Sequence, residues 1–376
     1  MSSRDESLLQ PPPLLFDTWL RVHFSQTPPE WADFHYQWLR AQCPLDRHAQ
    51  TGERTVDLSD IAAEVRPLAA AVIADGEEAI LRIEWSGAER RQSRYAFAWL
   101  REHAYARNRE VPPPPPSDLR AITLRAGDHP DDESLVVAAL ARVAERGAVV
   151  VRGYRRPGRS EVAEPADPDD TEALIRAFGL ARLAIIGTHF GRIEDLRTDN
   201  TTNQNTDQLG YTDAAIEVHT DQPFLDAPPR YQLLHCMRAA AEGGDNHLVD
   251  ARAAARYLEA TDAEAFRLLT TVPVRFHRKQ RAFERLVISP MLRLDAEGRF
   301  QVRYSYFTMA PQQLPFAEMA AWLRAYRRFA ELVRDPAHRY TLRLGPGDFI
   351  LYDNHRTLHA RTGFRGARWV RGVYFN

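Results

Sequence analysis

Five consecutive prolines at positions 112–116 divide the chain of 376 residues. Proline has a fixed φ and no backbone N–H, so this run can neither continue a helix nor fill a central strand. We expect a stiff, extended connector there. The sequence therefore predicts a small N-terminal domain over residues 1–111, a proline linker at 112–116 and a larger domain over residues 117–376.

The pattern before the prolines predicts a small α+β domain. Residues 31–39 and 95–107 carry aromatic and apolar side chains at helix-like spacing. Residues 79–85 alternate between apolar and polar, which is typical of a strand.

Short β-like runs recur after the prolines, separated by turn signals such as the Gly-Pro-Gly-Asp at 345–348. The runs are residues 148–152, 231–234, 272–276, 301–307, 349–352 and 369–375. Residues 315–335 carry an apolar stripe at helical spacing, which predicts a helix packed on the core. Many short strands with helices outside predict a mainly β, α+β domain with the architecture of a double-stranded β-helix, or jelly roll. Its interior can hold a metal and a small ligand.

Composition excludes some functions. Lysine and arginine total 49 against 51 acidic residues, so no charge excess favours nucleic acid or an anionic membrane as a partner. No stretch approaches the about 18 apolar residues of a membrane span. The two cysteines, Cys43 and Cys236, and the lack of a basic segment followed by an apolar run predict a reducing, cytoplasmic setting. We expect a small-molecule substrate.

The motif with the most chemical content is His219-Thr220-Asp221, followed much later by His359. Two histidines and one carboxylate leave open positions on a metal, as in non-haem Fe(II) oxygenases. A zinc hydrolase could use the same residue types. The tripeptide alone is weak evidence, because the chain has 13 histidines and a second His-x-Asp at 129–131. That second copy, with proline at its centre, is typical of a turn.

An arginine near the C-terminus supplies a second part of the expected site. Arg368 follows His359 within Arg368-Trp369-Val370-Arg371. A guanidinium can bind a carboxylate through two parallel hydrogen bonds, as the far carboxylate of a keto-acid would require. Arg371 is the competing choice.

Several segments together resemble a known family. They are His219-Thr220-Asp221-Gln222-Pro223-Phe224, Pro228-Pro229-Arg230-Tyr231, Gly243-Gly244-Asp245, Gly345-Pro346-Gly347-Asp348, Asp353-Asn354, Leu358-His359-Ala360-Arg361 and the Arg368 motif. They resemble the γ-butyrobetaine hydroxylase and trimethyllysine dioxygenase branch of the TauD/TfdA superfamily. The resemblance implies Fe(II) as cofactor, with 2-oxoglutarate and O2 as cosubstrates. It places iron on His219, Asp221 and His359, and 2-oxoglutarate on Arg368.

The resemblance extends to the N-terminal part, with one departure. Such accessory domains often bind zinc through three cysteines and a histidine, but here only Cys43 remains, and Arg91 stands where the histidine is expected. Arginine has no lone pair to give, and Cys43 with nearby His48 falls short of four ligands. We therefore predict no zinc. The resemblance also implies a homodimer.

The family's quaternary-ammonium substrates lie in an aromatic cage, held by cation–π contacts. By resemblance, Tyr211 and Tyr374 correspond to two cage tyrosines, and Phe190 replaces a third aromatic residue. Glu194 falls near the position of a missing tryptophan and could neutralise a cation by charge. The alternative for Tyr374 and Phe190 is that they only fill the core.

The expected contacts to the substrate's acid group differ from the family pattern. Gln208 and Phe307 stand where γ-butyrobetaine hydroxylases have asparagines. Arg303 is an alternative contact, and the segment containing it resembles 2-trimethylaminoethylphosphonate dioxygenase. The tyrosines considered with Arg303 are Tyr304 and Tyr306. The amide-rich stretch 198–208 could bind an oxyanion or could be a solvated loop.

These observations predict an Fe(II)- and 2-oxoglutarate-dependent dioxygenase. We expect it to hydroxylate an unactivated C–H of a small, trimethylammonium-bearing substrate, with 2-trimethylaminoethylphosphonate as one candidate. The runner-up is γ-butyrobetaine hydroxylase itself. A non-catalytic jelly-roll protein that binds metal and 2-oxoglutarate is the alternative from another class.

Overall fold

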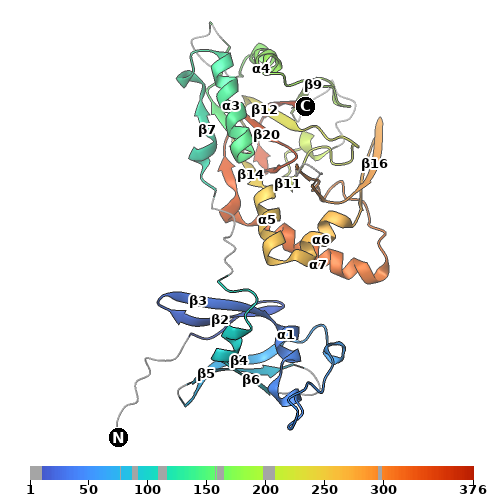
Figure 1. Cartoon of the computed structure of the whole chain (residues 1–376). Coiled ribbons are helices and arrows are strands. Elements are labelled where there is room, and N and C mark those ends of the chain that lie inside the picture. The colour runs from blue at the N-terminus through green and yellow to red at the C-terminus, as the bar shows by residue number, and fades with distance from the viewer. Residues whose placement is uncertain are drawn as a thin grey trace. The chain divides into compact units, whose positions relative to one another are not determined.

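A computed structural model describes residues 11–76, 78–86, 92–108, 117–156, 158, 165–197, 208–294 and 299–376. The chain forms two compact units, Met1–Val111 and Pro112–Asn376, both drawn in Figure 1. The proline run lies outside the described residues, so its extended conformation stays a prediction.

The first unit consists of two small antiparallel sheets with two short helices. One sheet has the order β1-β2-β3 and the other β4-β5-β6. The strands are β1 (Leu14–Leu15), β2 (Trp19–Gln26), β3 (Pro29–His35), β4 (Pro67–Asp75), β5 (Glu78–Trp85) and β6 (Gln92–Ala96). The helices are α1 (Tyr36–Ala41) and α2 (Phe97–Glu102). Side chains of both sheets and both helices share one apolar core.

The strand expected at 79–85 is confirmed by β5, but the two expected helices are much shorter than the sequence pattern suggested. Residues 31–35 belong to β3, and the helix begins only at Tyr36. Likewise β6 runs to Ala96, and α2 ends at Glu102. Short runs of aromatic residues fit both the helical and the strand period, and pairing with neighbouring strands decides between them.

The turn after Cys43 in the first unit lacks the donors of a zinc site. Cys43 is buried, and the side chains of Arg40 and Asp46 form a buried ion pair beside it. His48 is exposed. Within the described residues of this unit, no three histidine, cysteine or acidic side chains gather closely enough to hold a metal. These residues do not fit zinc. Arg91 lies outside the described residues, and the absence of zinc stays a prediction.

The second unit is organised around two sheets. The larger has seven strands in the order β10-β23-β12-β20-β8-β7, with β9 paired to β23, and the smaller has four in the order β11-β21-β14-β19. The larger contains β7 (Thr123–Arg125), β8 (Ala148–Arg152), β9 (Ile185–Ile186), β10 (Glu194–Leu196), β12 (Tyr231–Arg238), β20 (Phe349–Asp353) and β23 (Trp369–Phe375). The smaller contains β11 (Ile216–His219), β14 (Asn246–Asp250), β19 (Tyr340–Leu342) and β21 (Thr357–Arg361).

Three further pairs of short strands complete the β-structure of the described part of this unit. They are β13 (Glu242–Gly243) with β22 (Phe364–Arg365), β15 (Val274–Gln280) with β16 (Phe283–Ser289), and β17 (Leu292–Leu294) with β18 (Phe300–Val302).

Helices cover the outer faces of both sheets (Figure 1). α3 (Asp132–Arg146) and α4 (Pro168–Leu180) share a core with β8, β12, β20 and β23. α5 (Ala251–Thr261), α6 (Ala263–Thr271) and α7 (Phe316–Arg334) share another with β11, β14 and β21. A third core joins the inner faces of the two sheets, with Leu234 and Ile350 from the larger and Leu248 and Leu342 from the smaller. The sheets therefore pack face to face between two layers of helices.

Strand alternation decides which side chains enter the space between the sheets. On β21, Leu358 packs toward the helices while His359 points the other way. On β12, Leu233 packs toward α3 and α4, whereas Gln232 and Leu234 face inward.

Most expected elements of the second unit are found. The strands at 148–152 and 369–375 are confirmed by β8 and β23, and the helix at 315–335 by α7. The run at 301–307 was wrong as a single strand, since β18 ends at Val302. In the part of the chain that the structure describes, no helix is long and apolar enough to cross a membrane.

Candidate active site

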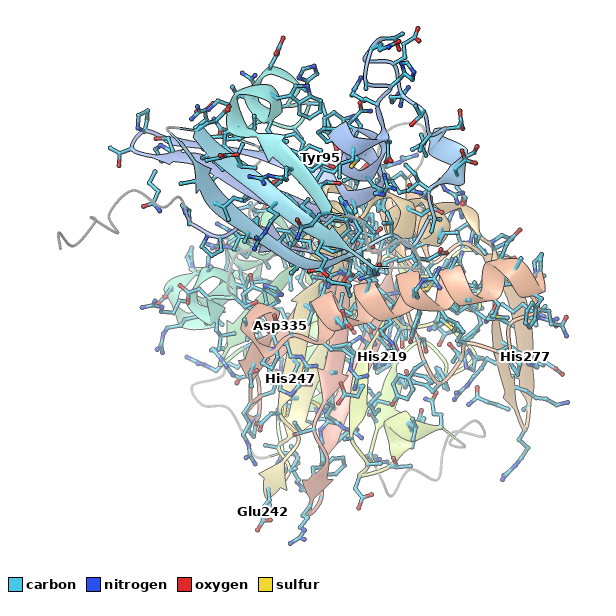
Figure 2. The ribbon with its side chains drawn as sticks, turned by 90° about the horizontal axis from the view of Figure 1, so that it is seen from below. Tyr95, His219, Glu242, His247, His277 and Asp335 are labelled. Atoms are coloured by element: carbon cyan, nitrogen blue, oxygen red, sulfur yellow. The ribbon has the colours of Figure 1, made fainter. Side chains whose placement is uncertain are left out.

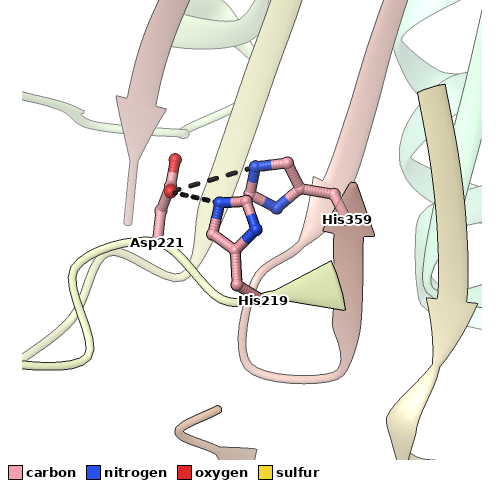
Figure 3. Close-up of side chains that lie close together, drawn as sticks. All are labelled: His219, Asp221 and His359. Atoms are coloured by element: carbon pink, nitrogen blue, oxygen red, sulfur yellow. Dashed lines mark ion pairs between the residues drawn. The ribbon is translucent and has the colours of Figure 1, made fainter. Parts of the chain in front are cut away.

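The three residues of the sequence motif lie together between the sheets. His219 ends β11 and pairs in register with His359 on β21. Asp221 Oδ1 lies 3.4 Å from His219 Nε2 and 3.9 Å from His359 Nε2, as Figure 3 shows. One ligand atom from each residue falls within 4.8 Å of the other two. Among the described residues, this is the cluster of three that could hold a metal ion.

The histidines present the nitrogen that a metal needs. His219 Nδ1 lies 2.8 Å from the carbonyl oxygen of Glu217, so the proton sits on Nδ1 and the lone pair of Nε2 faces Asp221. The ring of His359 lies 5.0 Å from that of Tyr352, and its Nδ1 has no hydrogen-bond partner among the described residues.

Asp221 is held through both its backbone and its side chain. Its N–H donates to Asn354 Oδ1 at 2.9 Å, and Asn354 Nδ2 donates back to its carbonyl oxygen at 3.0 Å. The Tyr374 hydroxyl donates to Asp221 Oδ2 at 2.9 Å. One carboxylate oxygen is thus occupied by tyrosine, and the other faces the histidines.

The pKa values in this cluster favour metal-binding forms. Burial, and then His219, lowers the pKa of His359 to about 3, so this imidazole is neutral at physiological pH. Burial by itself would raise the pKa of Asp221, but His359 and His219 hold it below its usual value. Neutral imidazole and ionised carboxylate are the forms that bind a metal.

Arg368 lines the same pocket as the three motif residues. It is 8% exposed, and its guanidinium lies over the ring of Phe364, 5.5 Å from the ring centroid, while no hydrogen bond or ion pair of this group is found among the described residues. Burial lowers its pKa to about 10, which still leaves it charged. Arg371 instead faces away from the pocket, with its side chain bonded to Pro168 O at 2.7 Å and paired with Asp195 at 3.3 Å. Position therefore favours Arg368 for binding an anion in the pocket.

Four of the residues expected to contact substrate line this pocket, namely Phe190, Glu194, Gln208 and Tyr374. Tyr211, on the short turn of residues 209–211, is not among the residues that line this pocket, but its side chain is hydrogen-bonded to Glu194, which lines it. The ring of Tyr211 lies 6.3 Å from that of Phe190.

Glu194 is fully buried beside Tyr374. Gln208 Nε2 donates to its Oε1 at 3.0 Å, and the Tyr374 hydroxyl lies 3.3 Å from its Oε2. Burial, and next the charge of Asp221, raises the pKa of Glu194 to about 8. The carboxyl is therefore mostly neutral at pH 7 in this structure, and a nearby cation would favour its ionised form.

The expected contacts at Arg303, Tyr304 and Tyr306 must be corrected, because none of them lines the pocket. The guanidinium of Arg303 donates to the carbonyl oxygens of Pro223, Leu225 and Asp226. It thereby holds the segment after Asp221 rather than a ligand. Tyr304 packs in the helical core, with its ring 5.7 Å from that of Tyr326, and Tyr306 is exposed.

Other pocket residues were missed by the sequence reasoning. Arg278, from β15, donates to Gln208 Oε1 at 2.9 Å, and nothing in the sequence indicated that this strand reaches the pocket. Gln222 is 4% exposed, and both polar atoms of its side chain lack a partner among the described residues. Thr308 Oγ1 is similarly buried without a partner. Gln222 could have been singled out, since it directly follows Asp221 in the motif.

Histidines elsewhere do not join the cluster. Figure 2 shows His219 within the second unit and His277 toward its edge. His277 lies on β15 and pairs with Glu284, and His247 on β14 bonds to Thr341. Neither lines the pocket.

Two histidines and a carboxylate with open positions are typical of non-haem iron oxygenases. The family model described as taurine catabolism dioxygenase TauD, TfdA family matches residues 113–374. The chain therefore belongs to the TauD/TfdA family of dioxygenases.

The relatives also support the expected branch of this family. Gamma-butyrobetaine dioxygenase from Pseudomonas sp. (strain AK-1) is 30% identical over 364 residues, which are 92% of this chain and 89% of that protein. Trimethyllysine dioxygenase from Meyerozyma guilliermondii is 29% identical over 365 residues, which are 92% of this chain and 88% of that protein. The resemblance to the γ-butyrobetaine and trimethyllysine branch is thus confirmed.

Likeness to solved structures is weaker. A taurine dioxygenase from Burkholderia xenovorans has a TM-score of 0.48 and 14% identity, over 69% of this chain and 88% of that chain. A TM-score below 0.5 supports no argument about the site.

Proposed function

We propose that the protein is an Fe(II)- and 2-oxoglutarate-dependent dioxygenase that hydroxylates an unactivated C–H bond of a small, trimethylammonium-bearing substrate. One observation carries this proposal. A cluster of two histidines and one carboxylate shares a pocket with a buried arginine that makes no hydrogen bond or ion pair among the described residues. We further propose that the two facing sheets form a double-stranded β-helix with outer helices.

The donor set fits iron. His219, Asp221 and His359 offer two imidazole nitrogens and one carboxylate oxygen, and leave positions open for other ligands. The iron, when bound with 2-oxoglutarate and O2, supplies the oxidising power for the C–H bond, and the cosubstrate leaves as succinate and CO2.

Arg368 fits the far carboxylate of 2-oxoglutarate. A buried cation that contacts an aromatic ring but makes no hydrogen bond or ion pair is incompletely compensated, and a bound carboxylate would neutralise it through charge-assisted hydrogen bonds. A zinc hydrolase has no 2-oxo acid cosubstrate whose carboxylate such an arginine would bind, although an arginine could bind the carboxylate of its substrate.

The chain's own contribution is to bind, orient and exclude water. Phe224 and Phe307 line the pocket, and the ring of Phe307 lies 5.0 Å from that of His219. Apolar walls around the metal ligands limit the access of water to the reacting centre.

We propose that the cationic trimethylammonium group and the anionic acid group of the substrate bind to different sets of pocket residues. Phe190, Tyr374 and Glu194 offer ring faces and a carboxyl to a trimethylammonium group. Gln222 and Thr308 offer polar atoms without partners among the described residues, which suit the oxygens of an acid group. Either a carboxylate or a phosphonate satisfies this chemistry.

Two substrates are therefore the leading candidates. γ-Butyrobetaine is favoured by the activity named for the Pseudomonas relative. 2-Trimethylaminoethylphosphonate is favoured by Gln208 and Phe307, which line the pocket where the resemblance expects asparagines.

The test is O2 consumption and succinate formation against γ-butyrobetaine, trimethyllysine and 2-trimethylaminoethylphosphonate, with Fe(II) and 2-oxoglutarate present. We expect one of them to stimulate both at least about tenfold over the rate without substrate. Turnover that needs no O2 would indicate a hydrolase. Binding of Fe(II) and 2-oxoglutarate without any stimulated turnover would favour the non-catalytic alternative.

We propose that the first unit is an accessory domain without zinc and that the protein is a homodimer. The buried Arg40–Asp46 pair beside Cys43 supports the lack of zinc. Metal analysis of the purified protein and its mass in solution by light scattering test both statements. Stoichiometric zinc that is lost on replacing Cys43, or a monomeric mass, would contradict them.

A further inference from the structure

Three buried polar side chains form a row across the inner face of the larger sheet. Gln232 on β12 pairs in register with Tyr352 on β20 and with Tyr374 on β23. Tyr352 and Gln232 are at most 1% exposed, and Tyr374 is 3% exposed. The Tyr352 hydroxyl donates to Gln232 Oε1, and Gln232 Nε2 donates to the Tyr374 hydroxyl at 3.2 Å.

The row ends on the metal-ligand candidate Asp221. Tyr374 donates its hydroxyl proton to Asp221 Oδ2 at 2.9 Å, and the competing oxygen of Glu194 is farther away at 3.3 Å. Asp221 Oδ1 remains directed at the Nε2 atoms of His219 and His359. The hydrogen bond from Tyr374 therefore separates the two carboxylate oxygens, leaving one for the metal.

Each tyrosine has a single hydroxyl proton, so the direction of donation matters. A glutamine side chain accepts at its oxygen and donates at its nitrogen. While the oxygen of Gln232 accepts from Tyr352, its nitrogen faces Tyr374, which must then donate elsewhere. If the amide turned over, its oxygen would face Tyr374 and compete with Asp221 for the proton.

We propose that Tyr352 is a positioning residue of the active site. It keeps the amide of Gln232 in the orientation that directs the Tyr374 proton to Asp221, and so holds Asp221 as a metal ligand through one oxygen. Tyr352 acts through two other side chains and does not touch the metal, the cosubstrate or the substrate. The inference rests on the proposed function, because it requires a metal bound by Asp221.

The experiment measures the affinity of the full-length protein for Co(II) alone, anaerobically and without 2-oxoglutarate or substrate. Wild type must bind Co(II), and Asp221→Ala must lose it; failure here would count against the proposed function. With that established, we expect Tyr352→Phe to bind Co(II) about tenfold more weakly, at the lower end of effects for side chains that hold metal ligands. Tyr374→Phe should reduce the affinity for Co(II) by at least as much.

The decisive variant combines Tyr352→Phe with Gln232→Met. Methionine removes the competing amide oxygen, so Tyr374 can again donate only to the acidic side chains near it, and Co(II) affinity should recover to within about twofold of wild type. The matched control is Tyr154→Phe, another buried tyrosine of the same unit, whose hydroxyl lies 3.2 Å from Asp132. It should bind Co(II) as wild type does.

Thermal unfolding of each variant separates loss of folding from loss of the metal ligand. The proposal is overturned if Tyr352→Phe binds Co(II) as the Tyr154→Phe control does. It is also overturned if adding Gln232→Met to a folded Tyr352→Phe protein fails to restore the affinity, because a merely structural role of Tyr352 would give that result.

Discussion

The two sheets that face each other in the second unit contribute different kinds of side chain to the pocket. The smaller sheet supplies His219 and His359, whose ring nitrogens offer lone pairs. The larger sheet, with the residue just before β23, supplies Arg368, Gln232 and Tyr374, whose polar hydrogens suit oxygen atoms. The difference supports the proposal that the metal is bound from one sheet and its oxygen-rich partners from the other.

Asp221 connects the two sheets. One of its carboxylate oxygens faces the histidines of the smaller sheet, and the other accepts from Tyr374 of the larger sheet. Its position in the loop after β11, clamped by Asn354, allows this double contact. A substitution on either sheet should therefore change metal binding, but by a different amount and with a different measurement to detect it.

The largest effect is expected on the smaller sheet. His359→Ala removes a metal ligand, so Fe(II) binding and substrate-dependent succinate formation should fall by more than the about 100-fold seen when only a supporting side chain is changed. His247→Ala is the matched control, because His247 lies on the neighbouring strand β14 and outside the pocket. Retained turnover in His359→Ala, or equal losses in both variants, would break the assignment of the ligands.

On the larger sheet, Arg368→Met should weaken 2-oxoglutarate binding by about 3 kcal/mol, which is roughly 100-fold, through the loss of two charge-assisted hydrogen bonds. Without ligands the same variant should be more stable than wild type by about 1 kcal/mol, because it removes a buried charge that makes no hydrogen bond or ion pair, while methionine can still pack against the Phe364 ring that Arg368 covers. Titration calorimetry and thermal unfolding check the two effects.

Arg371→Met is the control, since Arg371 bonds to Pro168 and Asp195 away from the pocket. It should keep the 2-oxoglutarate affinity and lose some stability. If instead Arg371→Met weakened 2-oxoglutarate binding and Arg368→Met did not, the 2-oxoglutarate carboxylate would be assigned to Arg371.

A smaller effect is expected at Gln222, between the two sheets. Gln222→Met removes an amide that has no partner among the described residues, so the free energy of unfolding should not fall. If the amide binds the substrate's acid group, KM should rise about tenfold, the equivalent of about one hydrogen bond to a charged group. Gln301→Met should lower the free energy of unfolding and leave KM unchanged, because Gln301 bonds to His355 outside the pocket. An unchanged KM in Gln222→Met would remove this contact from the substrate site.

A further effect, on the pH dependence of stability and not on the pocket, concerns a buried histidine on the outer face of the larger sheet. Burial, and then Arg371, lowers the pKa of His235 from 6.5 to about 3. Above pH 6.5 neither the folded nor the unfolded state binds this proton, and the stability is fully present. As the pH falls from 6.5 toward 3, only the unfolded state binds it, and stability is lost by up to about 1.4 kcal/mol per pH unit.

Chemical denaturation of wild type and His235→Gln at pH 7, 6, 5 and 4 isolates this contribution. The difference in free energy of unfolding between the two proteins should change steadily in favour of the variant below pH 6. A difference that does not depend on pH would show that folding leaves the pKa of His235 unchanged and would contradict this account.

Long periodic patterns and local motifs were the parts of this molecule that the sequence could predict. The apolar stripe of α7 and the runs of β8 and β23 were recognised because each pattern extends over its whole element. The candidate metal ligands were recognised because two of them are two residues apart in one motif. The assignment of iron to them stays a prediction that the geometry supports.

Features that depend on strand register or on competing partners could not be predicted. The row of Tyr352, Gln232 and Tyr374 comes from three separate segments and exists only because β20, β12 and β23 pair in one register. Arg303 was expected in the pocket because Gln208 and Phe307 replace the family's asparagines and because the segment containing it resembles 2-trimethylaminoethylphosphonate dioxygenase. Its guanidinium is instead used by three backbone carbonyl groups, which no sequence pattern shows.

The most direct test of the central claim is anaerobic absorption spectroscopy of the full-length protein with Fe(II) and 2-oxoglutarate. A weak visible charge-transfer band should appear only when both are added. It should be absent in Asp221→Ala and should need about 100-fold more 2-oxoglutarate in Arg368→Met. A folded wild-type protein that shows no band with both present, or a band that survives in Asp221→Ala, would contradict the claim that this pocket binds iron and 2-oxoglutarate together.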